Sequence, residues 1–172
     1  GDECPKVRWE KRPRCQARIR QLGLRDKDGY TAEHYLQGYV TDRIGKYLAE
    51  RGRRIIGWDE ILEGQAPSDA IVMSWRGSAG GIKAAKLGHD VIMTPNSHFY
   101  FDYYQSPDAD AEPFGIGGCV TIDKVYSFDP MADLTPGQQA HILGVQANLW
   151  TEYIASDDHL EYMLLPRLAA LS

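Results

Sequence analysis

The sequence predicts an α/β fold in which short parallel strands alternate with helices. Four apolar runs have the length of buried strands, and segments with helical periodicity lie between or beside them. The runs are RRIIGWDEI (53–61), AIVMSW (70–75), DVIMTP (90–95) and ILGVQANLW (142–150). Short strands joined by helices imply a parallel sheet with right-handed crossovers.

The helical segments are indicated by apolar residues three and four positions apart. In residues 31–51 one apolar face is predicted, with Thr31 as the N-cap and Gly52 as the stop signal. Its members are Tyr35, Leu36, Tyr39, Val40, Ile44, Tyr47 and Leu48. Residues 77–88 form a second amphipathic pattern that ends at Gly88, and residues 157–172 form a third with an acidic start, which suits a helix N-terminus.

The segment 96–141 interrupts this alternation of predicted strands and helices. It is rich in aromatic residues, Gly and Asp and has no clear periodicity. A connection of this length between regular elements is usually functional, so we expect it to contribute to a site. The chain also enters at what reads as a strand end and finishes inside an apolar helical pattern, so we expect a longer parent protein.

Composition bounds the class of protein. The 172 residues carry a formal net charge of −5, which disfavours a nucleic-acid partner because phosphate binding needs a basic surface. A basic cluster at helical spacing, Lys11, Arg12, Arg14, Arg18 and Arg20, is interpreted as a solvated face. No run approaches the ~20 apolar residues of a membrane span. The three cysteines have no metal-binding spacing, and the sequence leaves open whether Cys4 and Cys15 are bridged or reduced.

Polar and aromatic side chains follow each apolar run. The residues concerned are Trp58, Asp59 and Glu60; Trp75 and Arg76; Asn96, Ser97 and His98; and Asn148, Trp150 and Glu152. The carboxyl ends of parallel strands meet at one edge of the sheet, where α/β proteins bind ligands. Three tryptophans interleaved with carboxylates suit a sugar, whose C–H face packs on aromatic rings while its hydroxyls find acceptors.

Asp2 and Glu3 form an adjacent carboxylate pair that is ambiguous on its own. Neighbouring residues of a regular strand point to opposite faces. Both could serve one site only where the strand breaks into a loop.

Taken in order, these motifs resemble glycoside hydrolase family 20, the β-N-acetylhexosaminidases. GDECPKVRWEK resembles the catalytic segment, GRRIIGWDEILEG the fifth strand and AIVMSWRG the sixth. VIMTPNSHFYFDYYQ resembles the seventh strand with its Tyr-x-Asp motif, GVQANLWTEYI the eighth with its Trp-x-Glu motif, and LPRLAALS the closing helix. The resemblance implies that residues 1–172 are the C-terminal half of a family 20 catalytic domain, a partial (β/α)8 barrel with about strands 5–8 and the end of strand 4.

The resemblance also implies roles for individual residues. Glu3 is expected to be the general acid and base, Asp2 to hold the substrate's acetamido N–H, and Tyr100 to hold its carbonyl oxygen. Trp58, Trp75 and Trp150 are expected to enclose the sugar, and Asp102 and Glu152 to accept hydrogen bonds from its hydroxyls. Asp59 and Glu60 are interpreted as supporting residues rather than a second catalytic pair. No metal or organic cofactor is implied, and the partner is a glycan bearing N-acetylhexosamine.

The family's sugar-binding Arg and its His near the acid have no counterpart in this sequence, and residues 101–149 contain no Trp for the leaving-group side. Three hypotheses therefore remain: a hexosaminidase segment active when completed by the missing half, a non-catalytic sugar-binding remnant, and a half-barrel inactive by itself. The exposed edges of a half-barrel predict self-association. Substrates of this class favour a periplasmic, secreted or lysosomal parent.

Overall fold

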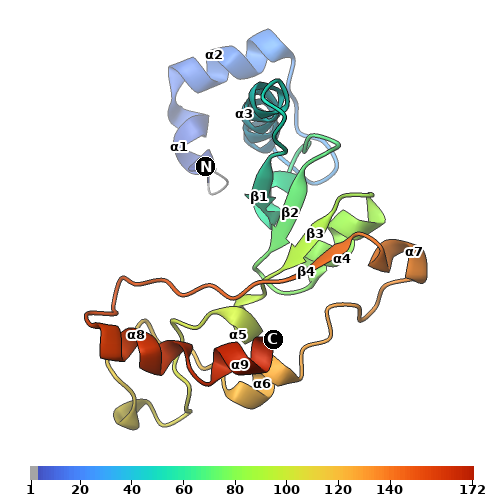
Figure 1. The fold of residues 1–172 in the computed structure, drawn as a ribbon. Coiled ribbons are helices and arrows are strands. Elements are labelled where there is room, and N and C mark those ends of the chain that lie inside the picture. Colours follow the sequence, from blue (N-terminus) through green and yellow to red (C-terminus); the bar gives the residue numbers. More distant parts are fainter. Residues whose placement is uncertain (1–3) are drawn as a thin grey trace.

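The structure of the chain, a computed structural model, describes residues 4–172. Within that range four strands form a parallel sheet in the order β1-β2-β3-β4 (Figure 1). They are β1 (Ile56–Trp58), β2 (Ile71–Ser74), β3 (Val91–Met93) and β4 (Ile142–Val145). Ile56 pairs with Ile71, Val72 with Val91, and Val91 with Ile142. The predicted parallel α/β sheet is confirmed, and each strand lies inside one of the four apolar runs.

The main core lies between the sheet and α4 (Ala79–Lys86). Val72, Val91 and Met93 are almost fully buried and pack with Ala84 and Ala85 of the helix. Gly81 permits the close approach, because a Cβ at that position would lie 2.6 Å from the sulfur of Met93. The β2–β3 connection is thus the helical crossover that the sequence predicts.

The β3–β4 connection is different. Residues 94–141 contain no long helix but four short ones: α5 (Asn96–Phe99), the 3-10 helix η2 (Ala109–Ala111), α6 (Ile122–Tyr126) and α7 (Pro136–Gln139). A second core of Phe99, Phe101, Val120 and Val125 forms here. Figure 1 shows α5, α6, α8 (Asp157–Leu164) and α9 (Arg167–Leu171) grouped together below the sheet. The strands are therefore not all joined by regular crossover helices.

The C-terminal helical pattern is divided in two. Residues 157–172 show one apolar periodicity, but the chain is extended at Leu165 (φ −101°, ψ 145°) and α9 begins after Pro166. A proline disfavours helical backbone at the preceding residue and has no N–H to donate, so the helix breaks there.

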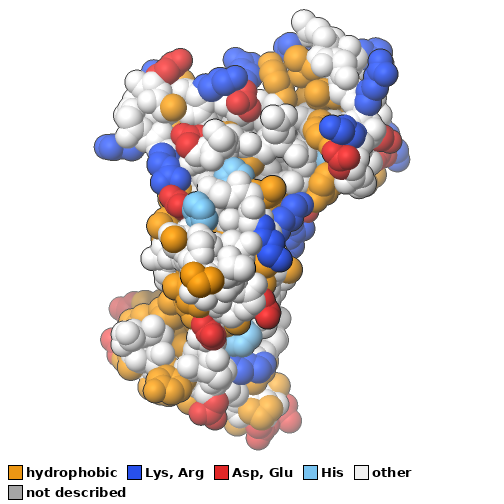
Figure 2. Space-filling model, turned by 90° about the vertical axis from the view of Figure 1, so that its right-hand side faces the viewer, with side chains coloured by type: hydrophobic (Ala, Val, Ile, Leu, Met, Phe, Trp, Pro, Cys, Tyr) orange, Lys and Arg blue, Asp and Glu red, His pale blue; other side chains and the backbone are white. Residues whose placement is uncertain are grey.

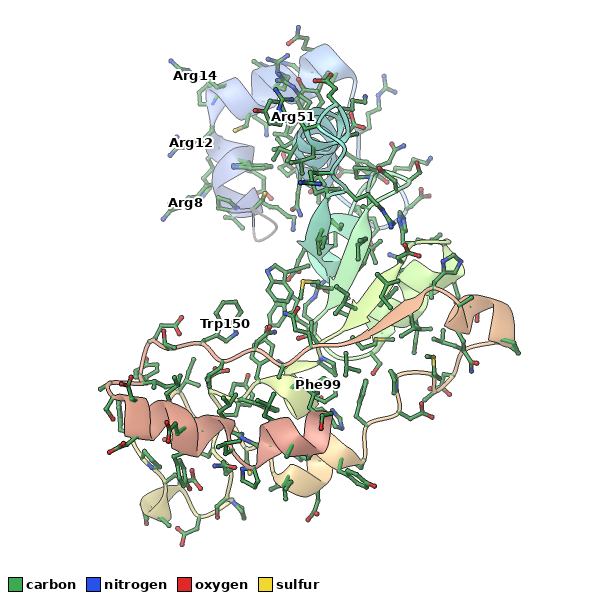
Figure 3. The ribbon with its side chains drawn as sticks, viewed as in Figure 1. Arg8, Arg12, Arg14, Arg51, Phe99 and Trp150 are labelled. Carbon is green, nitrogen blue, oxygen red and sulfur yellow. The ribbon has the colours of Figure 1, made fainter. Side chains whose placement is uncertain are left out.

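The N-terminal part forms three helices, α1 (Lys6–Lys11), α2 (Pro13–Leu22) and α3 (Ala32–Ala49), which lie together at the upper end of Figure 1. The whole basic cluster is exposed, as predicted for a solvated face. Figure 3 shows Arg8, Arg12 and Arg14 projecting outward from α1 and α2, and Figure 2 shows most Lys and Arg side chains over this upper part.

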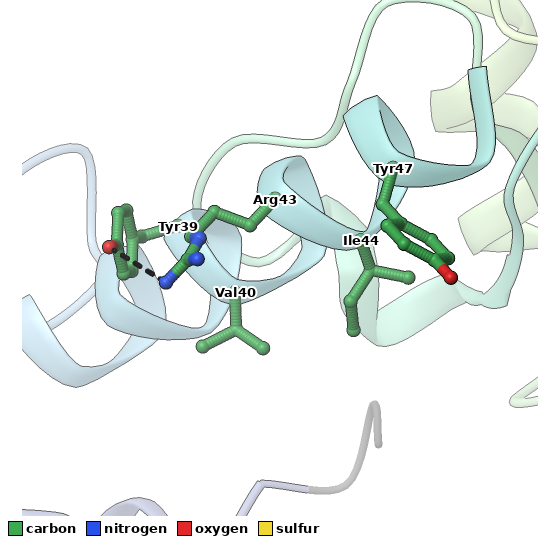
Figure 4. Close-up of a pocket in the computed structure, with 5 residues that line it drawn as sticks. All are labelled: Tyr39, Val40, Arg43, Ile44 and Tyr47. Atoms are coloured by element: carbon green, nitrogen blue, oxygen red, sulfur yellow. Dashed lines mark hydrogen bonds between the residues drawn. The ribbon is translucent and has the colours of Figure 1, made fainter. Parts of the chain in front are cut away.

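The predicted single apolar face of α3 is wrong in part. The helix begins as expected, with Thr31 and His34 forming a capping box. Its buried side, however, includes Leu36, Gln37 and Thr41, whereas Val40, Ile44 and Tyr47 are exposed and line a shallow pocket with Tyr39 and Arg43 (Figure 4). Gly38 and Gly45 lie on the buried side because side chains there would meet Gln65 and Pro67. The close approach at these glycines decides which side of the helix faces the protein.

Cys15 and Cys119 are free cysteines, so the Cys4–Cys15 bridge that the sequence left open is not formed. Of the helices in residues 4–172, none has both the length and the apolar character needed to cross a membrane.

Candidate functional site

A pocket of about 420 Å³ lies at the C-terminal ends of the strands. It is lined by Trp58, Trp75, Tyr100, Asp102, Tyr103, Ile116, Trp150 and Glu152. Trp58 ends β1, Trp75 follows β2, Tyr100 and Asp102 follow β3, and Trp150 and Glu152 follow β4. All six pocket residues predicted in the described part of the chain therefore share one cavity. Asp2 and Glu3 lie outside the described residues.

Aromatic rings form a connected wall around this cavity. The ring of Trp75 stacks on that of Tyr100, with centroids 6.2 Å apart and planes at 19°. Trp150 meets Tyr100 edge-on, with ring centroids 6.3 Å apart, and lies tilted at 55° to Trp58, with centroids 6.1 Å apart. Trp150 is 42% exposed, and Figure 3 shows its ring in the open space beside the sheet. The wall presents flat apolar faces, one of them still accessible, to any ligand in the pocket.

Asp102 is the most unusual carboxylate of the pocket. It is only 5% exposed, and neither of its carboxylate oxygens has a side-chain hydrogen-bond partner. Burial raises the pKa of Asp102, the backbone N–H groups of Asp102 and Trp150 lower it, and the nearby negative charge of Glu152 raises it. Buried polar atoms are normally paired, so an under-paired carboxylate on a pocket-lining residue is a candidate acceptor for hydroxyl or amide donors of a ligand.

Tyr100 is prepared as a hydrogen-bond donor. Burial raises the pKa of its phenol to about 12, with a further contribution from the charge of Asp102. The hydroxyl therefore keeps its proton throughout the pH range in which most proteins are stable. The Tyr100 ring is held between Trp75 and Tyr103, whose ring centroid lies 5.7 Å away.

The segment carrying Tyr100 and Asp102 is tied to the end of β4 by backbone hydrogen bonds. Phe101 N–H donates to the carbonyl of Asn148 at 2.7 Å, and Asn148 N–H donates to the carbonyl of Phe99 at 2.8 Å. The Asn148 amide also donates to Thr94 Oγ1 at 2.7 Å. This bridge extends the β3–β4 pairing beyond the regular strands and brings Tyr100 next to Trp150 in space.

Asp59 and Glu60 support the wall rather than line the cavity. They belong to the 3-10 helix η1 (Asp59–Leu62) and are 2% and 6% exposed. Both carboxylate oxygens of Glu60 accept from the indole N–H of Trp75, at 2.9 and 3.0 Å. Asp59 accepts from Arg76 Nε at 2.5 Å and from the backbone N–H of Trp75 at 3.2 Å. This arrangement agrees with their interpretation as supporting residues.

Sequence reasoning missed two residues that line the pocket, and not every polar residue noted after a strand reaches it. Tyr103 and Ile116 come from the aperiodic segment 96–141, where no pattern separates pocket residues from the rest. Asn96, Ser97 and His98 follow β3 but do not line the cavity, because α5 turns the chain away and His98 packs 5.0 Å from the ring of Phe128. Among residues 4–172, no three His, Cys, Asp or Glu side chains are placed to hold a metal ion.

Comparison with known proteins gives consistent matches along the chain. It is 47% identical to a beta-hexosaminidase of Porphyromonas gingivalis over its whole length, which is 22% of that protein. It is 31% identical to a beta-hexosaminidase of Vibrio furnissii, again over the whole chain and 28% of the relative. The chain thus spans between 22% and 28% of the length of these relatives.

Solved structures agree. The exo-β-N-acetylglucosaminidase of Vibrio harveyi in complex with N-acetylglucosamine superposes with a TM-score of 0.78 at 29% identity, over 95% of this chain and 25% of that one. The chitobiase of Flavobacterium johnsoniae gives the same score and identity over 99% of this chain and 24% of its own. The family model described as "Glycosyl hydrolase family 20, catalytic domain" matches residues 1–172. The chain therefore belongs to glycosyl hydrolase family 20.

Proposed function

We propose that the protein containing this chain hydrolyses terminal non-reducing β-linked N-acetylhexosamine residues with retention of configuration. The observation that carries the proposal is the pocket itself, in which three tryptophans, Tyr100 and two carboxylates meet at the C-terminal edge of a parallel sheet. Flat apolar faces combined with unpaired carboxylate oxygens match a sugar ring and its hydroxyls.

The proposed mechanism uses the substrate's own acetamido group as the nucleophile, a known exception to the two-carboxylate scheme in this family. The acetamido oxygen attacks the anomeric carbon and forms an oxazolinium ion while the glycosidic bond breaks. Glu3 protonates the departing oxygen and later removes a proton from the attacking water. Asp2 accepts the acetamido N–H and stabilises the positive charge that develops there.

The described residues supply the other contacts of this scheme. Tyr100 donates its phenolic hydrogen to the acetamido oxygen and fixes it for attack, which its raised pKa supports. Trp58, Trp75 and Trp150 exclude water from the acetamido group and the sugar ring. Asp102 and Glu152 accept hydrogen bonds from hydroxyls toward the 4- and 6-positions, which would give the buried oxygens of Asp102 the partners they lack.

We also propose that residues 1–172 are the C-terminal half of the catalytic domain, corresponding to about strands 5–8 of a (β/α)8 barrel. The sequential strand order supports this, as do the exposed edge residues Ile56 (51%) and Leu143 (56%). Barrel closure removes sheet edges, so the missing strands would cover them. The exposed apolar residues of α3 fit the same interpretation. By itself the half-barrel is expected to be inactive, because its pocket is open to water on one side.

The test compares substrates that differ only at the 2-position. The full-length protein should hydrolyse nitrophenyl N-acetyl-β-glucosaminide, or the galactosaminide, and leave nitrophenyl β-glucoside almost untouched. The first product released, followed by NMR, should be the β-anomer. Comparable rates on the glucoside, or release of the α-anomer, would contradict the substrate-assisted mechanism.

A further inference from the structure

Arg167 is a fully buried cation that no predicted role accounts for. It opens α9 and has 0% exposure. Its guanidinium forms no ion pair in the described part of the chain, and all its hydrogen bonds run to backbone carbonyls. Burying an arginine without a direct ion pair is costly, and burial lowers the pKa of Arg167 to about 10, although the charges of Glu112 and Asp102 act in the opposite direction.

The carbonyls that Arg167 binds belong mainly to the segment behind the pocket. Nη2 donates to the carbonyl of Phe101 at 2.6 Å, and Nη1 donates to that of Tyr103 at 2.8 Å and that of Val120 at 3.0 Å. Arg167 also donates to the carbonyl of Met163 in α8, from Nε at 3.1 Å and from Nη2. The guanidinium carbon also lies 4.9 Å from the centre of the Phe101 ring.

Phe101 and Tyr103 are the two neighbours of Asp102. The Tyr100 side of this segment is held separately, by the backbone bridge to Asn148. The Asp102 carboxylate, in contrast, has no side-chain hydrogen-bond partner and is approached only by the backbone N–H groups of Asp102 and Trp150, so its position depends on the backbone around it. One planar guanidinium can hold both flanking carbonyls at once because its donors form a rigid fork.

We propose that Arg167 is a positioning residue for Asp102: by binding the carbonyls of Phe101 and Tyr103 it holds the Asp102 carboxylate in the pocket. The inference rests on the proposed function, in which Asp102 receives sugar hydroxyls. The positive charge of Arg167 also favours the ionised, hydrogen-bond-accepting form of Asp102. Lysine cannot replace it, because an ammonium lacks the fork geometry.

The main experiment is a double-mutant cycle in the full-length protein, measured as kcat/KM on nitrophenyl N-acetyl-β-glucosaminide. Arg167→Lys should lower kcat/KM by about tenfold or more, since small misplacements of binding groups are costly. In an Asp102→Asn background the same change should cost less than about threefold, because the group it positions is already gone. In a Tyr100→Phe background the full loss should remain.

Val125→Ala is the matched control. Val125 is 3% exposed and lies in the same core as Phe101 and Val120. Its apolar side chain makes no hydrogen bond to the carbonyls that Arg167 binds. Val125→Ala should lower the melting temperature while changing kcat/KM by no more than about twofold, as expected for a core truncation remote from the site. Equal losses from Arg167→Lys in all three backgrounds would show a purely structural role and overturn the proposal.

A second measurement is hydrogen exchange, which needs no activity. The backbone amides of Phe101, Tyr103 and Val120 are bound by the carbonyls of Asn148, Tyr100 and Tyr104, so the comparison is between the wild type and its variants. These amides should exchange faster in Arg167→Lys and should be loosened less by Val125→Ala. Unchanged exchange in Arg167→Lys would refute the clamp even if the enzyme is active. A protein without hexosaminidase activity whose amides are loosened selectively by Arg167→Lys would refute the proposed function and leave the clamp in place.

Discussion

The contact between Glu60 and Trp75 gives the most direct test of how the pocket wall is held. Replacing Glu60 by alanine removes the acceptor of the Trp75 indole N–H. In the wild type this N–H is shared between the two carboxylate oxygens of Glu60, at 2.9 and 3.0 Å. A partly buried N–H without a partner costs about 1–3 kcal/mol, so we expect the free energy of unfolding to fall by about 2 kcal/mol. Arg76 keeps Asp59 and Glu63 as partners, so no unpaired cation adds to this loss.

Glutamine at position 60 separates the hydrogen bond from the charge. Burial raises the pKa of Glu60, so its ionised form is disfavoured in the folded protein. The neutral amide still offers one acceptor oxygen to Trp75 without that cost. Glu60→Gln should therefore change the free energy of unfolding by less than about 0.5 kcal/mol, far below the cost of an unpaired N–H.

The assay is urea unfolding together with the affinity for N-acetylglucosamine as a competitive inhibitor. Loss of the Glu60 acceptor frees the Trp75 ring to tilt, and we expect about tenfold weaker inhibition in Glu60→Ala. Glu63→Ala is the matched control, because Glu63 binds Arg76 at 2.7 Å and Lys6 at 2.8 Å but does not contact the indole N–H. Two outcomes would contradict the role of the Glu60–Trp75 hydrogen bond. One is that Glu63→Ala weakens inhibition as much as Glu60→Ala, and the other is that Glu60→Gln destabilises the protein as much as Glu60→Ala.

Four further predictions follow from the site and the fold. In the full-length protein Glu3→Gln should lower turnover by about 100-fold or more on natural glycosides and by less on nitrophenyl glycosides, whereas Asp2→Asn should impair both; equal losses for Glu3→Gln would contradict its role as the acid. Tyr100→Phe should lower kcat by about 100-fold, and any alkaline limb of the wild-type pH–rate profile below pH 11 should persist in the variant. Asp102→Asn should be more stable than the wild type, and the difference in the free energy of unfolding should grow as pH rises from 3.8, the ordinary pKa of an Asp carboxyl, to the raised pKa of folded Asp102. Over that window only the unfolded wild type loses the Asp102 proton, so the wild type becomes less stable while the variant does not change. A difference that stays constant with pH in urea unfolding would refute this. Residues 1–172 alone should self-associate in light scattering and show no hydrolysis of nitrophenyl N-acetyl-β-glucosaminide; a monodisperse, active monomer would show that the missing half contributes little.

Much of the fold could be predicted because the strands are encoded locally. Each apolar run is short, bounded by turn residues and followed by a Trp or a polar residue, so both the strand and its functional end are visible in the sequence. Parallel pairing then requires that the ends of β1 to β4 meet at one edge, which is why Trp58, Trp75, Tyr100, Asp102, Trp150 and Glu152 were found together. The helix start at Thr31 and the glycine after α4 were also readable from local signals.

What the sequence by itself determined is therefore the four strands, the helices α3 and α4, and the residues at the carboxyl ends of the strands. Tertiary structure alone decided which side of α3 is buried, since that depends on how closely Gly38 and Gly45 approach residues distant in sequence. It likewise decided that Tyr103 and Ile116 reach the pocket, and that Arg167, the single arginine of the C-terminal pattern 157–172, binds the carbonyls on both sides of Asp102. Periodicity shows which residues of a segment share a face, but which face is buried is fixed only when segments distant in sequence come into contact, as Gly38 does with Gln65 and Arg167 with Phe101.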